Sequence, residues 1–412
     1  MLKVKQLRIC SFLSLFSLMS FIFLLKPVRD VLGVFNGVNN LQWLFTASLI
    51  AIIPIHFLFR YFSLRYSLKK IVKGSYFGFA LLLVFFYLII YFSGVSKKVV
   101  TSFFVYASIS SLYSVSLFWV AMVNSFSSEA SKKVFGFVIA GGSLGAFSGS
   151  FLASSMMNFY PFQYLLLVAA FFLLVSLFFM SRILNLSENK RIIATNQSKF
   201  NLGVNFWKKL LKTTNHKYLF SIVIFMLLYS SISTVLYFEQ AYLVEGSIQG
   251  NENRLRYFSR IDSIINLMSL FGQLFITKWF IRKYSISTAL SIMPVILIIG
   301  FMIVNLKTSL LFVSILVILH KAGNYILIKP AREILFTICT REEKYKVKNF
   351  IDTIVYRGGD AFMGWVFTLL ISLGLGLSII ALLTIPILLY WAIVGNKLGN
   401  YHIIKENINN EE

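Results

Sequence analysis

The sequence predicts an all-α membrane protein with about twelve transmembrane helices, and two observations support this class. Of its 412 residues, 58% are hydrophobic and 13% are charged, whereas a soluble domain has about 45–50% apolar and about 25% charged residues. About twelve segments also contain the roughly 20 mostly apolar residues that one spanning helix needs. Their expected limits are 9–34, 41–62, 74–95, 99–126, 134–157, 162–184, 217–244, 257–281, 285–305, 309–339, 350–372 and 374–396.

The connectors between these segments divide the chain in two. Most are short and polar or basic, such as RYSLKK after the second segment and FIRKYS after the eighth. The exception is 185–216, which is long, polar and basic. We therefore expect an N-terminal six-helix half (1–184), a basic cytoplasmic linker (185–216), a C-terminal six-helix half (217–396) and a cytoplasmic tail (397–412). Two six-helix halves with internal repeats, joined by a basic loop, resemble the arrangement of major-facilitator-type transporters.

The net charge of +24 has two possible meanings. In a soluble protein it would suggest nucleic-acid binding. Here every predicted cytoplasmic connector is basic, which is the asymmetry that orients membrane proteins. We therefore predict a multi-pass protein of the bacterial inner membrane with both termini in the cytoplasm, the lipid bilayer as a partner, and no nucleic-acid partner.

The sequence gives no sign of metal, disulfide or enzyme chemistry. Cys10 and Cys339 are its only cysteines, and its four histidines are scattered without ligand spacing. No nucleophile–base pair or soluble catalytic domain is visible. We therefore expect no metal, no cofactor and no enzymatic activity.

Basic residues inside the apolar segments form the most informative pattern. KPVRDVL at 26–32 is repeated as KPAREIL at 329–335, and each places a lysine and an arginine three residues apart on one helix face. Charges within a membrane usually face a water-filled cavity or a partner. The guanidinium group of arginine and the ammonium group of lysine together are well suited to bind phosphate or carboxylate. The predicted substrate-binding residues are Lys26, Arg29, Lys329, Arg332, Arg357, Lys321 and Asn324. The prolines, Pro27 and Pro330, favour a kink or local unwinding.

The acidic residues inside the segments leave an alternative open. Asp30, Glu333 and Asp360 could neutralise these cations in gate or packing salt bridges, and the same acids could hold the cations when a substrate site is empty. Glu239 and Asp262 could be a proton- or ion-coupling pair, or could form ion pairs with Arg260.

Small residues in the fifth segment predict close helix packing. Gly141, Gly145 and Gly149 are spaced four apart in an apolar helix, which is the small-xxx-small pattern that lets two backbones approach. A dinucleotide-binding loop is not indicated, because no strand precedes these glycines and no Walker lysine follows.

Four stretches together resemble the bacterial branch of the ADP/ATP translocase family, the NTP/NDP exchange transporters. They are LKPVRD, FWVAMVNSFSSEASKKVFGFVIAGGSLGA, FSRIDSIINLMSLFGQLFIT and IKPAREILFTICTREEKYKVKNFIDTIVYRGGDA. The resemblance covers nearly the whole chain and implies a major-facilitator-like fold, ATP binding and ATP/ADP-type exchange. It also implies that Lys26, Arg29, Lys329, Arg332 and Arg357 contact phosphates.

The sequence thus predicts a secondary transporter that works by alternating access on an anionic solute, with nucleotide exchange as the leading hypothesis. We expect it to function as a monomer. One alternative is a proton-coupled transporter of another organic anion. The other is a membrane sensor or scaffold that transports nothing.

Overall fold

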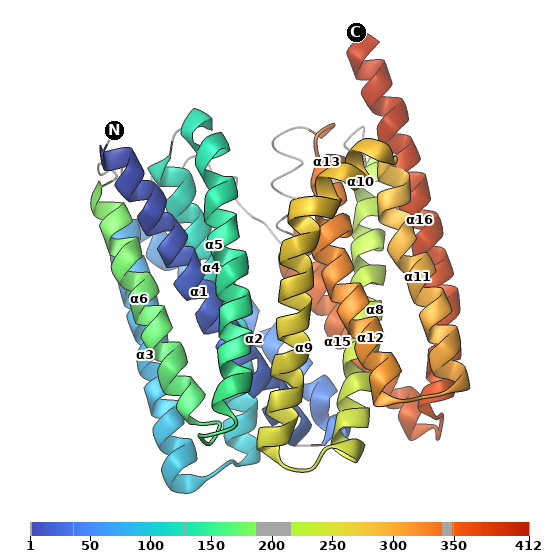
Figure 1. Ribbon diagram of the computed structural model, residues 1–412, viewed down its shortest axis with the longest axis horizontal. Helices are drawn as coiled ribbons and strands as arrows, with labels where there is room; N and C mark the ends of the chain where they lie inside the picture. Colours follow the sequence, from blue (N-terminus) through green and yellow to red (C-terminus); the bar gives the residue numbers. More distant parts are fainter. Residues whose placement is uncertain are drawn as a thin grey trace. The chain divides into compact units, whose positions relative to one another are not determined.

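The computed structural model describes residues 2–35, 37–126, 128–186, 216–339, 348 and 350–411. Over these ranges the chain is helical and contains no strand, so the all-α prediction is confirmed (Figure 1). Most of the predicted linker 185–216 lies outside the described residues, as do residues 340–347.

The described residues form eighteen helical elements that follow one another along the chain. In the first part they are α1 (Leu2–Phe35), η1 (Val38–Asn40), α2 (Leu41–Arg65), α3 (Leu68–Ser93), α4 (Lys97–Ser125), α5 (Ser128–Met156) and α6 (Tyr164–Leu186). In the second part they are α8 (His216–Ser247), α9 (Asn251–Phe271), η2 (Gly272–Ile276), α10 (Thr277–Lys283), α11 (Ile286–Leu306), α12 (Leu310–Gly323), η3 (Asn324–Ile328), α13 (Lys329–Leu335), η4 (Ile351–Val355), α15 (Tyr356–Ser372) and α16 (Leu377–Glu411).

Within the described ranges, eleven helices are long and apolar enough to cross a membrane. Each coincides with one of the twelve segments that hydropathy predicts. The remaining segment, 350–372, falls on η4 and the 17-residue helix α15. Local signals set the ends: Ser96, Ser285 and Ser309 cap α4, α11 and α12 by accepting a backbone N–H, and Gly94 follows α3 with a φ of 73°, a conformation that glycine adopts at little cost.

The chain forms two compact units. The first is drawn from Met1–Thr195 and Ile248–Leu270, and the second from Asn196–Ser247 and Phe271–Glu412. The helix α9 therefore belongs to the first unit through most of its length, although it follows α8 in the sequence. Its contacts explain this: the amide of Asn266 donates to the carbonyl of Ala146 at 3.1 Å and lies 3.3 Å from the hydroxyl of Ser150, both on α5.

The core of the first unit is built on α1, which contacts α4, α5 and α6. Gly141, Gly145 and Gly149 lie where α5 meets α1. A Cβ added at Gly145 would be 2.1 Å from the carbonyl oxygen of Phe16, and one added at Gly149 would be 2.5 Å from that of Ser20. The Ser20 hydroxyl also donates to the carbonyl of Gly145 at 3.1 Å. These two backbones are close enough that only glycine fits between them.

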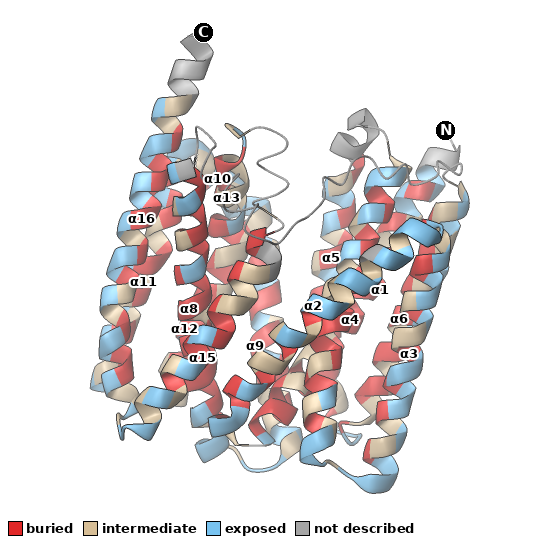
Figure 2. Cartoon of the chain, turned by 180° about the vertical axis from the view of Figure 1, so that it is seen from behind, coloured by how far each residue is buried: buried red, intermediate tan, exposed pale blue. Residues whose placement is uncertain are grey.

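The core of the second unit is built on α8, which contacts α12, α15 and α16. In α8, 72% of the most apolar stretch is buried, against 28% in α3 of the first unit. Figure 2 shows this contrast as nearly continuous red along α8 and mixed colours along α3. An apolar helix that is buried on most sides occupies the interior of its bundle.

Three π-helical turns lie in the described part of the second unit, and the two prolines of the repeated motif have different surroundings. The helix α1 continues without a break through Pro27, so the expected unwinding does not occur there. Pro330, by contrast, is the second residue of α13, which directly follows η3. Because Pro330 has no N–H to donate to the carbonyl of Ile326 four residues earlier, this carbonyl needs another donor. The hydroxyl of Thr277 supplies it at 2.7 Å.

The contact of α1 with α5 predicts the effect of a single methyl group. We expect Gly145→Ala to lower the melting temperature, because its Cβ would force the helices apart, and overpacking typically costs about 1–3 kcal/mol. Gly136→Ala on the same helix is the control, because a Cβ there meets nothing within 4 Å. Equal melting temperatures for the two variants in detergent would contradict the close contact.

Candidate functional site

The predicted site residues lie in both units. Lys26, Arg29, Asp30 and Asp262 belong to the first unit, and the other charged candidates belong to the second.

In the first unit, Lys26 on α1 forms an ion pair with Asp262 on α9. The side chain of Asp262 is 4% exposed and that of Lys26 is 23% exposed. Lys26 also lies 5.5 Å from the ring centroid of Phe23. The structure therefore pairs Asp262 with Lys26 and not with Arg260, which is exposed and makes no ion pair among the described residues.

The second cation of α1 is held by its neighbour in sequence. The guanidinium of Arg29 donates to Oδ1 of Asp30 at 2.8 Å and 3.1 Å. Its central carbon lies 5.2 Å from the ring centroid of Phe104 on α4, in cation–π contact. Asp30 is 2% exposed, and a buried carboxylate of this kind needs such a partner.

In the second unit, the cations of the span formed by α12, η3 and α13 have different surroundings. Lys329 is exposed and lies 5.7 Å from the ring centroid of Tyr325. Arg332 is 12% exposed, and its Nη1 lies 3.5 Å from the sulfur of Met226 on α8. Its Nη2 is 3.9 Å from Glu333, whereas Lys348 approaches the same carboxylate to 2.7 Å. The acid next to Arg332 is therefore bound more closely by another cation. Lys321 and Asn324 are half-buried on the same span.

The second unit also holds a cation and an acid on α15. Arg357 is half-buried and makes no ion pair with any described residue. Asp360, which is 6% exposed, accepts hydrogen bonds from the hydroxyls of Ser230 at 2.7 Å and Thr234 at 3.0 Å, both on α8. Gly359 makes this contact possible, since a Cβ there would lie 2.9 Å from the Ser230 hydroxyl.

Glu239 on α8 has an unusual environment for a carboxylate. It is 0% exposed, and neither carboxyl oxygen has a hydrogen-bond partner in the described part of the chain. An ionised carboxylate without a donor or cation is expensive inside a protein. Glu239 therefore differs from Asp30, Asp262 and Asp360, each of which accepts from a named donor.

Sequence reasoning missed a buried aromatic cluster that lies beside these charges. His320 stacks on Tyr229 with centroids 4.9 Å apart, and Trp391 lies within 6.0 Å of both rings. Both nitrogens of His320 and the indole nitrogen of Trp391 have no partner among the described side chains. The only feature of the sequence that could have indicated this cluster was the position of His320 directly before the candidate residue Lys321. Among the described residues, no group of His, Cys, Asp and Glu could hold a metal ion.

Comparisons with known proteins agree on the fold. The model of the Major Facilitator Superfamily matches residues 7–330. A comparison with curated protein sequences gives no match.

Solved structures share the fold at low sequence identity. The nucleoside transporter NupG is 14% identical, with a TM-score of 0.60 over 98% of this chain and 99% of that one. A D-xylose-proton symporter is 11% identical, with a TM-score of 0.65 over 96% of each chain. A POT family transporter in complex with 5-aminolevulinic acid is 10% identical, with a TM-score of 0.63 over 95% of each chain.

The ion pair of Lys26 and Asp262 predicts that substitutions at these two residues have strongly coupled effects on the stability of the protein. Asp262→Asn leaves a charged lysine without its carboxylate, and breaking a buried pair in this way costs about 3–5 kcal/mol. Lys26→Gln combined with Asp262→Asn removes both charges. The double variant should therefore lose less unfolding free energy than the two single variants lose together. Thermal unfolding of the four proteins measures the coupling. Lys97→Gln with Asp262→Asn serves as the uncoupled control, and additivity in both cycles would exclude the ion pair.

Proposed function

We propose that this chain, which belongs to the major facilitator superfamily and is therefore a membrane transporter and not an enzyme, moves an anionic solute by alternating access. The proposal extends to a phosphorylated solute, with ATP/ADP-type nucleotide exchange as its most specific form. It also includes a monomer in a bacterial inner membrane, with both termini in the cytoplasm.

The observation that carries the proposal is an arginine of the second unit that makes no ion pair among the described residues. Lys321, Lys329, Arg332 and Arg357 lie on its apolar spans, and Arg357 has no carboxylate partner in the described ranges. A charge at the centre of a bilayer costs at least about 2.5–3.5 kcal/mol on insertion scales, so an unpaired arginine there needs a compensating ligand. A guanidinium binds phosphate or carboxylate oxygens in a bidentate manner.

Three further points support a nucleotide. The repeated KPVRDVL and KPAREIL motifs lie within stretches that resemble the ADP/ATP translocase family. Among structures of similar fold, NupG is a nucleoside transporter. The half-buried Tyr325 and Tyr356 next to these cations could stack against a base.

The charge arrangement also gives exchange a physical basis. An empty cavity lined by cations resists closure, because closure removes water from charges of the same sign. A bound polyanion relieves this repulsion, so the loaded transporter closes more readily than the empty one. Net movement would then require a solute in each direction.

A second candidate rests on Glu239. A buried carboxyl without a donor or cation can take up and release a proton as the site opens and closes. This arrangement favours proton-coupled transport of another organic anion. The D-xylose-proton symporter has a similar fold.

Counter-exchange in proteoliposomes tests the first proposal. Labelled ATP should enter faster when the lumen contains ADP than when it is empty. Arg357→Gln should reduce the exchange rate about 10–150-fold, which corresponds to the loss of a charge-assisted hydrogen bond of about 1.5–3 kcal/mol. Arg357→Lys should recover part of the loss. Arg282→Gln is the control, because Arg282 is an exposed cation at the end of α10.

An ATP influx that does not depend on luminal ADP would reject nucleotide exchange. A normal exchange rate in the Arg357→Gln protein would instead reject the phosphate-binding role of Arg357. The absence of flux for nucleotides and for small organic acids alike would favour a sensor or scaffold.

Glu239→Gln tests the second candidate. If Glu239 carries the coupling proton, this variant should lose uptake driven by a pH gradient and retain exchange at equal pH, because glutamine imitates the protonated side chain. Glu252→Gln, on an exposed residue, should retain both activities. Uptake that follows the pH gradient in the Glu239→Gln protein would rule this role out.

A further inference from the structure

The start of α9 lines a pocket that the proposed site does not include. Its volume is about 420 Å³, and its lining residues are Ile248, Asn253, Arg256, Tyr257, Arg260 and Ile261. All of them belong to the first unit. We call this cavity the α9 pocket. Its volume lies within the range of about 300–1,000 Å³ that is typical of small-molecule sites.

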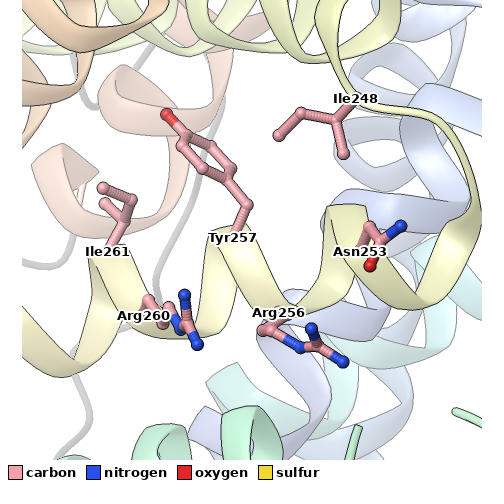
Figure 3. A pocket seen from close by; sticks show the side chains of 6 residues that line it. All are labelled: Ile248, Asn253, Arg256, Tyr257, Arg260 and Ile261. Carbon is pink, nitrogen blue, oxygen red and sulfur yellow. The ribbon is translucent and has the colours of Figure 1, made fainter. Parts of the chain in front are cut away.

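The helical spacing places the charged and the apolar residues of the lining on different sides of α9. Arg256 and Arg260 are four residues apart and therefore share one face of α9. Figure 3 shows their guanidinium groups along one side of the helix, with Tyr257 and Ile261 along the other. The pocket thus has a cationic wall and an aromatic–aliphatic wall on a single helix.

No acid compensates the cationic wall. The lining contains no Asp or Glu. Glu252, one turn before Arg256, is exposed and makes no ion pair among the described residues, and neither does Arg260. Asp262 is engaged by Lys26. Two cations four residues apart on a helix repel each other, and a bound anion would remove this repulsion.

One of the two arginines is held in place. Nη2 of Arg256 donates to the carbonyl of Met157, just after α5, at 3.0 Å. Its Nε is buried and has no partner in the described part of the chain. A buried N–H without an acceptor costs about 1–3 kcal/mol. The anchored guanidinium therefore keeps unused donor capacity on the same helix face as Arg260, which is exposed and makes no ion pair among the described residues.

From this arrangement we infer that the α9 pocket binds a phosphorylated small molecule with a flat ring, of which a nucleoside monophosphate is the simplest. Arg256 and Arg260 hold the phosphate, and Tyr257 packs against the ring. The inference rests on the proposed function, because it makes the pocket a docking site for the same class of solute. Asp262, which pairs with Lys26 of α1, lies two residues after Arg260 on α9, which is about 3 Å along the helix axis.

Protection of an engineered thiol tests the site directly. Asn253→Cys is introduced into full-length protein that carries Cys10→Ser and Cys339→Ser, so the new cysteine is the only thiol. Adenosine monophosphate should slow its modification by a methanethiosulfonate reagent at least tenfold, and inorganic phosphate should slow it less. Adenosine should have no effect. Adding Arg260→Gln should abolish the protection, and Arg260→Lys should weaken it.

The control is Lys98→Gln, which removes one exposed positive charge of the first unit that does not line the pocket and should leave protection unchanged. Equal melting temperatures verify that the variants are folded. Equal protection with and without Arg260, or protection by adenosine alone, would overturn the inference.

Exchange assays separate this inference from the proposed function. If adenosine monophosphate protects the thiol but no nucleotide is exchanged, the pocket stands and the exchange hypothesis fails. If nucleotides are exchanged but neither adenosine monophosphate nor inorganic phosphate protects the thiol, the α9 pocket is wrong and the exchange hypothesis stands.

Discussion

Charged side chains on apolar helices are the constraint on which this structure depends. The free energy needed to remove such a charge from water exceeds the free energy gained from one contact. Each charge must therefore have a charged or hydrogen-bonding partner or keep access to solvent. The first unit satisfies this internally: Lys26 pairs with Asp262 and Arg29 with Asp30. In the second unit Arg357 has no such pair among the described residues. This difference is why the second unit supplies the strongest argument for an anionic ligand.

Backbone chemistry imposes the second constraint, and it decides how close the helices come. Gly145 lets α5 reach the backbone of α1, and this contact lies beside the α9 segment that supplies Asp262. In the second unit, Pro330 cannot donate to the carbonyl of Ile326. This carbonyl lies in the π-helical turn η3 and accepts a hydrogen bond from Thr277 instead. The same KP dipeptide thus has different effects in α1 and α13, because only the second follows a π-helical turn.

The pairing of charges was harder to predict than the charges themselves. The sequence showed that Lys26, Asp262, Arg332 and Glu333 lie inside apolar segments. The sequence suggested Arg260 as one partner for Asp262 and left the partner of Glu333 open among the cations of the spans, but the structure brings Lys26 and Lys348 closest to these acids. Local spacing predicts contacts within one helix, whereas these partners depend on which helices pack together.

The all-α class, the positions of the apolar spans and the presence of cations within these spans followed from the sequence alone, because hydropathy and charge are local properties. The sequence could not determine that most of α9 packs with the first unit, that Glu239 has no donor among the described residues, or that Arg256, Tyr257 and Arg260 share a pocket. Only the tertiary structure decided these points, since each depends on which side chains from distant segments occupy the space around a residue.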